Sequence, residues 1–136
     1  MKRALLVSAL VVAGCSETSA GGFVTRTGVR VVPVNDMVFE VGARPGETMN
    51  ADFWCGAGDY ARRVLGAGDR DRVYVVSEAG QGAVIQGNST AQFSLSPPAQ
   101  TQGALGNVSH WGPKIGNQTT VVEARLKCRT HRSENN

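Results

Sequence analysis

Only one stretch of the sequence, Asn50–Leu65, has the apolar spacing of an α-helix, and this limits the folds that the chain can form. The other regular segments are short and typical of strands, and they span residues 29–34, 37–41, 72–77, 91–95 and 120–128. Because these segments do not alternate with helices, a parallel doubly wound sheet is not expected. We predict an α+β fold: a small antiparallel sheet of four to six short strands, with one main helix, about residues 50–65, packed on one face.

The predicted helix has an apolar stripe and a polar side. The stripe that should face the sheet contains Phe53, Trp54, Ala57, Tyr60, Ala61, Val64 and Leu65. Cys55 lies outside this stripe, so any partner for its sulfur must come from a segment along the flank of the helix. Gly56 and Gly58 inside the helix cost about 1 kcal/mol each relative to alanine, which implies either that a strand passes very close there or that the helix start is frayed.

Two of the strand regions carry more detailed expectations. The dipeptide Asn35-Asp36 predicts a hairpin between the first two strands, and Pro33 places the first of them at an edge of the sheet. Over 120–128, Thr120, Val122, Ala124, Leu126 and Cys128 alternate with mostly charged residues, which predicts a final strand with Cys128 on its core-facing side. This strand should lie beside the helix.

The segments between the strands are predicted from their turn-forming residues. Glu78–Gly82 is typical of a turn, leading into residues 83–86. Residues 99–118 are mostly polar and should form a long surface loop that Trp111 pins to the fold. Residues 131–136 form a polar tail.

The N-terminal residues have the pattern of a signal peptide. Lys2 and Arg3 form a positive region, and residues 4–14 form an apolar stretch that is too short to span a bilayer. The pattern predicts that the protein is exported.

The apolar stretch ends in Val-Ala-Gly before Cys15, and this VAGC sequence resembles the lipobox of bacterial lipoproteins. The resemblance implies that the chain is cut before Cys15, that the Cys15 thiol is diacylated, and that the lipid anchors the protein to a membrane. By the sorting rule of that family, Ser16 after the cysteine implies the outer membrane, with the protein facing the periplasm. Ordinary cleavage after Ala20 remains an alternative.

Cysteine use agrees with export. With Cys15 acylated or removed, Cys55 and Cys128 are left in an oxidising compartment, where a remaining pair normally forms a disulfide. We therefore expect a signal peptide over 1–14, a lipid-bearing flexible tether over 15–28, and a single small domain over 29–136 that the disulfide braces.

An enzymatic alternative uses the same cysteine. Cys55 near a helix start and His110 downstream could form the nucleophile and base of a thiol hydrolase acting on cell-wall peptide. Cys55, Cys128, His110 and His131 also add up to a Cys2His2 set, but export favours disulfide formation, so no metal site is expected. The sequence favours a non-enzymatic protein and leaves the hydrolase open.

A match to the dinucleotide-binding pattern G-x-G-x-x-A occurs at Gly56, Gly58 and Ala61. The pattern needs a strand that runs directly into a glycine turn, whereas here it falls inside the predicted helix. We expect no cofactor.

The charge of the chain limits its partners. The net charge is +3, and removal of Lys2 and Arg3 subtracts two charges and leaves +1, which argues against a nucleic-acid binder. Arg125, Lys127 and Arg129 share one face of the predicted final strand. They could contact an anionic envelope polymer or lipid phosphates, or they could simply keep a sheet edge soluble. A protein partner is also open.

Two further patterns bear on the class of protein. Sequons at Asn88, Asn107 and Asn117 would suit a secreted glycoprotein, although their residues are also ordinary turn formers. The run FWCGAGDYARRVLG resembles a helix in small exported proteins of Gram-negative bacteria, a likeness that implies no activity. The sequence thus predicts a non-enzymatic envelope lipoprotein, a binding or structural module, with the thiol hydrolase and the secreted glycoprotein as alternatives.

Overall fold

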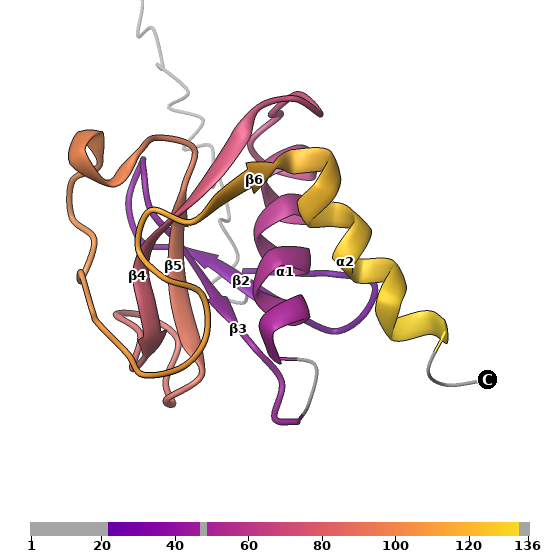
Figure 1. Cartoon of the computed structure of the whole chain (residues 1–136), viewed down its shortest axis with the longest axis horizontal. Coiled ribbons are helices and arrows are strands. Elements are labelled where there is room, and N and C mark those ends of the chain that lie inside the picture. Colours follow the sequence, from indigo (N-terminus) through magenta and orange to yellow (C-terminus); the bar gives the residue numbers. More distant parts are fainter. Residues whose placement is uncertain (1–21, 47–48, 134–136) are drawn as a thin grey trace, which may run out of the picture.

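The chain forms a six-stranded antiparallel sheet with two helices on one side of it, as the computed structural model shows (Figure 1). The structure describes residues 22–46 and 49–133. In chain order the elements are β1 (Phe23–Val24), β2 (Arg30–Pro33), β3 (Phe39–Gly42), α1 (Met49–Arg63), β4 (Arg72–Gly80), β5 (Thr90–Ser94), the 3-10 turn η1 (Pro98–Gln100), β6 (Gln118–Thr120) and α2 (Val121–Ser133). The predicted α+β class is confirmed.

The strands lie in the order β1-β2-β3-β5-β4-β6, and every neighbouring pair is antiparallel. Asn35 shapes the predicted hairpin between β2 and β3, because its Oδ1 accepts hydrogen bonds from the N–H groups of Met37 and Val38. The expectation that β2 is an edge strand is wrong, since β1 pairs with it. β1 reaches only Arg30 and Val31, however, so Pro33 lies beyond the part of β2 that this neighbour covers.

Helix α1 is covered on two sides, by the sheet and by α2 (Figure 1). Phe53, Ala57, Tyr60 and Ala61 from the predicted stripe are buried against the sheet. The side that the sequence marked as polar is also buried and includes Cys55, Gly58 and Asp59, because α2 packs over it. Val64 and Leu65 of the stripe are largely exposed, since α1 ends at Arg63.

Aromatic rings form the centre of the core between α1 and the sheet. The ring of Phe39 lies 4.7 Å from that of Tyr60 and 6.2 Å from that of Phe93, measured between centroids. Trp54 meets the edge of Phe93 at 5.4 Å. Valines of β2, β3 and β4 fill the space around these rings, so a core with few aromatics is still closely packed.

The predicted final strand is mostly a helix, and this is the largest correction to the fold. Only Gln118–Thr120 forms a strand, after which α2 runs from Val121. In the predicted strand, the side chains of Val122 and Leu126 would face the core. In the structure they are 41% and 46% exposed, whereas Val121 and Ala124 are fully buried. A spacing of three between buried residues fits a helix, and Glu, Ala, Arg, Leu and Lys in this segment are all strong helix formers.

The segments around β4 and β5 differ in part from the expectation. β4 continues to Gly80, so the turn predicted over Glu78–Gly82 begins later, and residues 83–86 form bends instead of regular structure. The long connection after η1 is a surface loop as expected. Trp111 fastens it, with its ring 6.0 Å from that of Phe53 on α1.

The sequence predicted a flexible tether over residues 15–28. This prediction is wrong for the second half of the segment, and residues 15–21 lie outside the described ranges. Phe23 and Val24 pair with β2. The Phe23 ring packs edge-on against Tyr60 at 5.9 Å. Folded structure therefore begins before Val29, because Phe23 finds an apolar surface on α1 that the sequence alone could not indicate.

Candidate functional site

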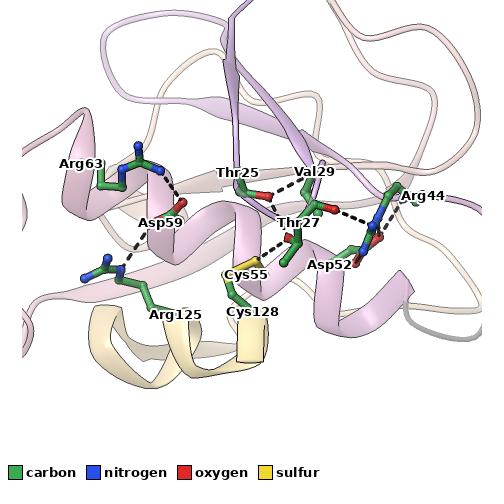
Figure 2. The surroundings of a disulfide bond; sticks show 10 residues. All are labelled: Thr25, Thr27, Val29, Arg44, Asp52, Cys55, Asp59, Arg63, Arg125 and Cys128. Carbon is green, nitrogen blue, oxygen red and sulfur yellow. Dashed lines mark hydrogen bonds and ion pairs between the residues drawn. A yellow bond between two sulfur atoms is a disulfide. The ribbon is translucent and has the colours of Figure 1, made fainter. Parts of the chain in front are cut away.

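A disulfide joins the two helices at the centre of the candidate site (Figure 2). It links Cys55 of α1 to Cys128 of α2, with 4.8 Å between the two Cα atoms. The Cys55 side chain is fully buried, and the Thr27 hydroxyl lies 3.5 Å from its sulfur. The two cysteines expected to pair are thus brought together, but by a second helix along the flank of α1 and not by a strand.

Gly58 lets the two helices approach closely enough for this bridge. A Cβ at Gly58 would lie 2.6 Å from the Cβ of Ala124 and 2.7 Å from the backbone nitrogen of Arg125, both on α2. A Cβ at Gly56 would lie 2.5 Å from a methyl group of Val41 in the sheet. The expectation that a strand passes very close is confirmed at Gly56, whereas the close neighbour of Gly58 is the helix α2. This packing leaves no room for a pyrophosphate at the G-x-G-x-x-A match.

Asp59 lies one turn beyond Cys55 and faces two arginines (Figure 2). Its Oδ2 lies 3.1 Å from Nη1 of Arg63, and its Oδ1 lies 3.4 Å from Nε of Arg125 on α2. The Asp59 side chain is 10% exposed, whereas both arginines reach solvent. One buried carboxylate therefore holds two guanidinium groups at the seam between the helices.

These arginines belong to a groove of about 470 Å³ that we call the arginine groove. Its basic lining consists of Arg26, Arg63, Arg125 and Arg129. Asp59 is the only carboxylate among the described residues that line it. In the described part of the chain, no hydrogen bond or ion pair engages the guanidinium groups of Arg26 and Arg129. Four positive charges against one negative charge make this a concave surface suited to an anion.

The loop that carries Arg26 is held in place by a small set of hydrogen bonds. Thr25 and Val29 are bonded to each other through both backbone and side chain. Arg44 donates to the carbonyl oxygen of Thr27 and binds the fully buried Asp52 of α1 through Nε and Nη2, at 3.2 and 3.0 Å (Figure 2). The hydrogen bonds to Asp52 raise the pKa of Arg44 above its ordinary value, so this clamp stays charged.

Apart from Thr27, the remaining wall of the groove is apolar. Val122 and Leu126 of α2 line it, together with Cys128 of the disulfide. Because Val122 and Leu126 lie one helical turn apart, they form a partly exposed apolar strip between the arginines. The groove thus combines guanidinium groups with hydrocarbon, a composition that suits an amphiphilic anion better than a small hydrated one.

The three basic residues predicted to share a face do not all reach this groove. Arg125 and Arg129 line it together because they are four positions apart on a helix. Lys127 instead lines another hollow, with Trp54 and Glu123, on the other side of α2. Arg26 and Arg63 were missed, since only the tertiary fold brings their segments beside α2.

The sequence did not identify two further carboxylates, Glu40 and Glu78. Both are buried, and both accept hydrogen bonds from groups that are distant in the chain. Glu40 accepts hydrogen bonds from the backbone N–H groups of Ala83, Val84 and Ile85 and from Nε2 of Gln92. Burial alone would raise the pKa of Glu40, but these four donors together hold it below its ordinary value. A carboxylate whose oxygens are fully engaged in this way serves as an anchor for the bends after β4.

Glu78 anchors the long loop in the same manner. It accepts hydrogen bonds from the N–H groups of Ser109 and Ile115, at 2.9 and 3.1 Å, and lies 3.3 Å from Nζ of Lys114. The bonds from Ser109 and Ile115 lower the pKa of Glu78. No signal in the sequence pointed to either role, because the partners of Glu40 and Glu78 are backbone groups more than 30 positions away.

The residues of the thiol-hydrolase alternative are not assembled as a pair. The Cys55 sulfur is bonded to Cys128, and no hydrogen bond in the described ranges joins it to His110. His110 lies exposed in the long loop, next to Trp111, which packs on Phe53. The sulfur of Cys55 is therefore paired with Cys128, as the sequence favoured, and not with His110 as in the hydrolase alternative.

The other predicted sites are placed as follows. Within residues 22–46 and 49–133, no three His, Cys, Asp or Glu side chains are grouped closely enough to hold a metal ion. The sequon residues Asn107 and Asn117 hydrogen bond within the long loop and its surroundings, to Gln81 and Lys114. Cys15, the predicted lipidation site, lies outside the described residues, as does the alternative cleavage site after Ala20.

Comparisons with protein-family models, with curated proteins and with solved structures find no match for this chain. Among the described residues, no helix has both the length and the apolar character needed to cross a bilayer.

Proposed function

We propose that this protein is an exported envelope lipoprotein, acylated at Cys15, whose folded part is a non-enzymatic module that binds an anionic component of the envelope. The observation that carries the binding role is the arginine groove, which is lined by four arginines and a single carboxylate. The anionic group that such a surface recognises best is a phosphate, because guanidinium forks match its oxygens.

Two features support the non-enzymatic part of this proposal. The disulfide occupies the sulfur that a hydrolase would need as a nucleophile. Asp52, Asp59, Glu40 and Glu78 are each engaged by arginine or by hydrogen-bond donors. These contacts hold loops and helices together, so these four carboxylates serve the architecture of the fold.

Two features support the envelope lipoprotein. The lipobox-like sequence before Cys15 follows directly on an apolar stretch of signal-peptide length. A disulfide between α1 and α2 suits an oxidising compartment outside the cytoplasm. Placement in the outer membrane, facing the periplasm, rests on Ser16 and the sorting rule of the lipoproteins that the segment resembles.

The anchor is tested by intact mass spectrometry of the chain purified from bacterial membranes. We expect a chain that begins at Cys15 and carries the mass of two or three acyl groups. A chain that begins at Gly21 with no added mass contradicts the anchor and supports ordinary secretion.

The binding role is tested with inorganic polyphosphate as the probe. We expect the full chain to bind it at low salt and to lose affinity steeply as salt rises, because the attraction is between exposed charges. Replacement of Arg26 and Arg129 by glutamine should weaken binding by about 10-fold or more, at ~1 kcal/mol for each charge near an anionic surface.

The matched control replaces Arg30 and Arg70 by glutamine, which changes the net charge by the same amount. Both arginines are exposed and lie outside the groove. Arg30 precedes Val31, which faces α1 near Gly56, so Arg30 points to the opposite face of the sheet. Equal loss of affinity in the two double variants would mean that net charge, and not the groove, binds the probe, and would contradict the proposal.

A further inference from the structure

The arginine groove lies beside the point at which the chain enters the fold. Arg26 of the groove lies two residues after the end of β1 at Val24. The guanidinium carbon of Arg63 lies 4.9 Å from the centroid of the Phe23 ring, so a cation–π contact joins the first strand to the groove. Any attachment point close to Phe23 in the sequence is therefore close to the groove in space.

The length of chain between Cys15 and Gly22 limits how far the groove can be from an anchor at Cys15. A fully extended chain advances by at most 3.6 Å for each residue, so these seven steps reach at most ~25 Å. An acyl group on Cys15 thus holds the groove within a small distance of the phosphate groups at the bilayer surface.

The lining of the groove matches that surface in chemistry. Its guanidinium groups suit lipid phosphates, and the exposed side chains of Val122 and Leu126 between them suit the glycerol and upper acyl region. A free phosphate ion would gain nothing from this apolar strip. The combination favours a phospholipid headgroup over a soluble phosphate.

We infer that the arginine groove is the face by which the domain docks on its own membrane, with Arg26 and Arg129 at anionic phospholipid headgroups. The inference rests on the proposed acylation of Cys15 and deepens the proposed function by naming the anionic component. Arg63 and Arg125 contribute charge but stay fixed by Asp59. Docking in this way fixes the orientation of the sheet relative to the bilayer, because α1 and α2 then lie on the membrane side.

The test is chemical footprinting of the acylated full chain in lipid nanodiscs. One set of discs contains phosphatidylcholine with phosphatidylglycerol, and the other contains phosphatidylcholine alone. Phenylglyoxal modifies accessible arginines, and peptide mass spectrometry gives the rate at each position. Wild-type protein is used throughout, so no variant can fail to fold.

We expect Arg26 and Arg129 to react at least about fivefold more slowly in the anionic discs, the factor that corresponds to ~1 kcal/mol for each arginine. Arg30 and Arg70 serve as internal controls and should react equally in both discs. About 0.5 M salt should remove the protection, because the Debye length then falls to roughly 4 Å and the attraction between exposed charges is screened.

Equal rates at Arg26 and Arg129 in the two discs would overturn the inference. Equal protection by millimolar inorganic phosphate in the phosphatidylcholine discs would also overturn it, in favour of a soluble ligand. If polyphosphate still binds the groove in either case, the proposed binding role stands and only the membrane docking fails. A purified chain that lacks the acyl mass overturns the anchor and this inference together.

Discussion

Gly58 of α1 faces Ala124 of α2 at a separation that excludes any side chain larger than hydrogen, since a Cβ at Gly58 would lie 2.6 Å from the Ala124 Cβ. This contact brings the two helices together at the level of the disulfide and of Asp59. The arginine groove is formed where the helices meet, so its shape depends on the contact.

Replacement of Gly58 by alanine should therefore destabilise the protein. The added methyl group meets a Cβ and the backbone nitrogen of Arg125, and neither can move without displacing α2. Overpacking of this kind costs about 1–3 kcal/mol, of which the better helix propensity of alanine recovers part. Urea unfolding measures the difference. Gly68→Ala is the control, because there the nearest atom is an Asp71 carboxylate oxygen at an ordinary 3.5 Å.

Loss of the disulfide should cost about 2–5 kcal/mol of unfolding free energy. The variant is Cys128→Ser, which removes the bridge over a sequence separation of 73 residues. A reductant should lower the urea midpoint of the wild-type protein towards that of the variant and leave the variant unchanged. An unaltered midpoint for Cys128→Ser would count against a bridge that braces the helices.

The buried carboxylate of Glu40 predicts a specific dependence of stability on pH. Burial raises the pKa of Glu40 and four hydrogen bonds lower it, and the resulting pKa lies below the ordinary glutamate value of 4.5. A carboxylate with a lowered folded-state pKa contributes stability that is present above pH 4.5 and is lost as the pH falls through the folded-state pKa. Stability should therefore decrease on acidification below that point.

Replacement of Glu40 by glutamine should remove this contribution. At neutral pH the variant should lose about 1–3 kcal/mol, because an amide places its own donor against the N–H groups of Ala83, Val84 and Ile85. Its unfolding free energy should then change less with acid than that of the wild type. Asp36→Asn, at an exposed position between β2 and β3, is the control and should follow the wild-type curve.

Asp59 gives a prediction in which stability and binding change in opposite directions. Asp59→Asn leaves Arg63 and Arg125 without their shared carboxylate, so the protein should unfold at a lower urea concentration. The same change removes the one negative charge of the groove, so polyphosphate should bind several-fold more tightly at low salt. A loss of binding in a variant that remains folded would argue that the groove does not attract anions.

Local patterns in the sequence predicted those parts of the fold that local chemistry determines. Asn35 forms the hairpin turn through bonds to residues two and three positions away, and the stripe around Phe53 defines the buried side of α1. The segment after Thr120 could not be assigned in this way. Its apolar residues satisfy a period of two over 120–128, and Val121, Ala124 and Cys128 satisfy the helical period equally well.

The candidate site depends on contacts that no local pattern contains. Cysteine counting in an export context identified Cys55 and Cys128, because pairing follows from number and compartment. The arginine groove draws on Arg26, Arg63 and Arg125 from three separate segments. Their proximity follows from the packing of α2 on α1, which was not predicted, so only half of the basic lining was named in advance.

The central claim is that the sulfurs of Cys55 and Cys128 are joined to each other, which fixes α2 on α1 and shapes the groove. Peptide mapping of the protein digested without reductant, after alkylation of free thiols, tests this most directly. The account predicts one linked peptide pair containing Cys55 and Cys128, which separates on reduction, and no alkylated form of either residue. Recovery of Cys55 as an alkylated free thiol in the native protein would contradict the account and support the thiol-hydrolase alternative.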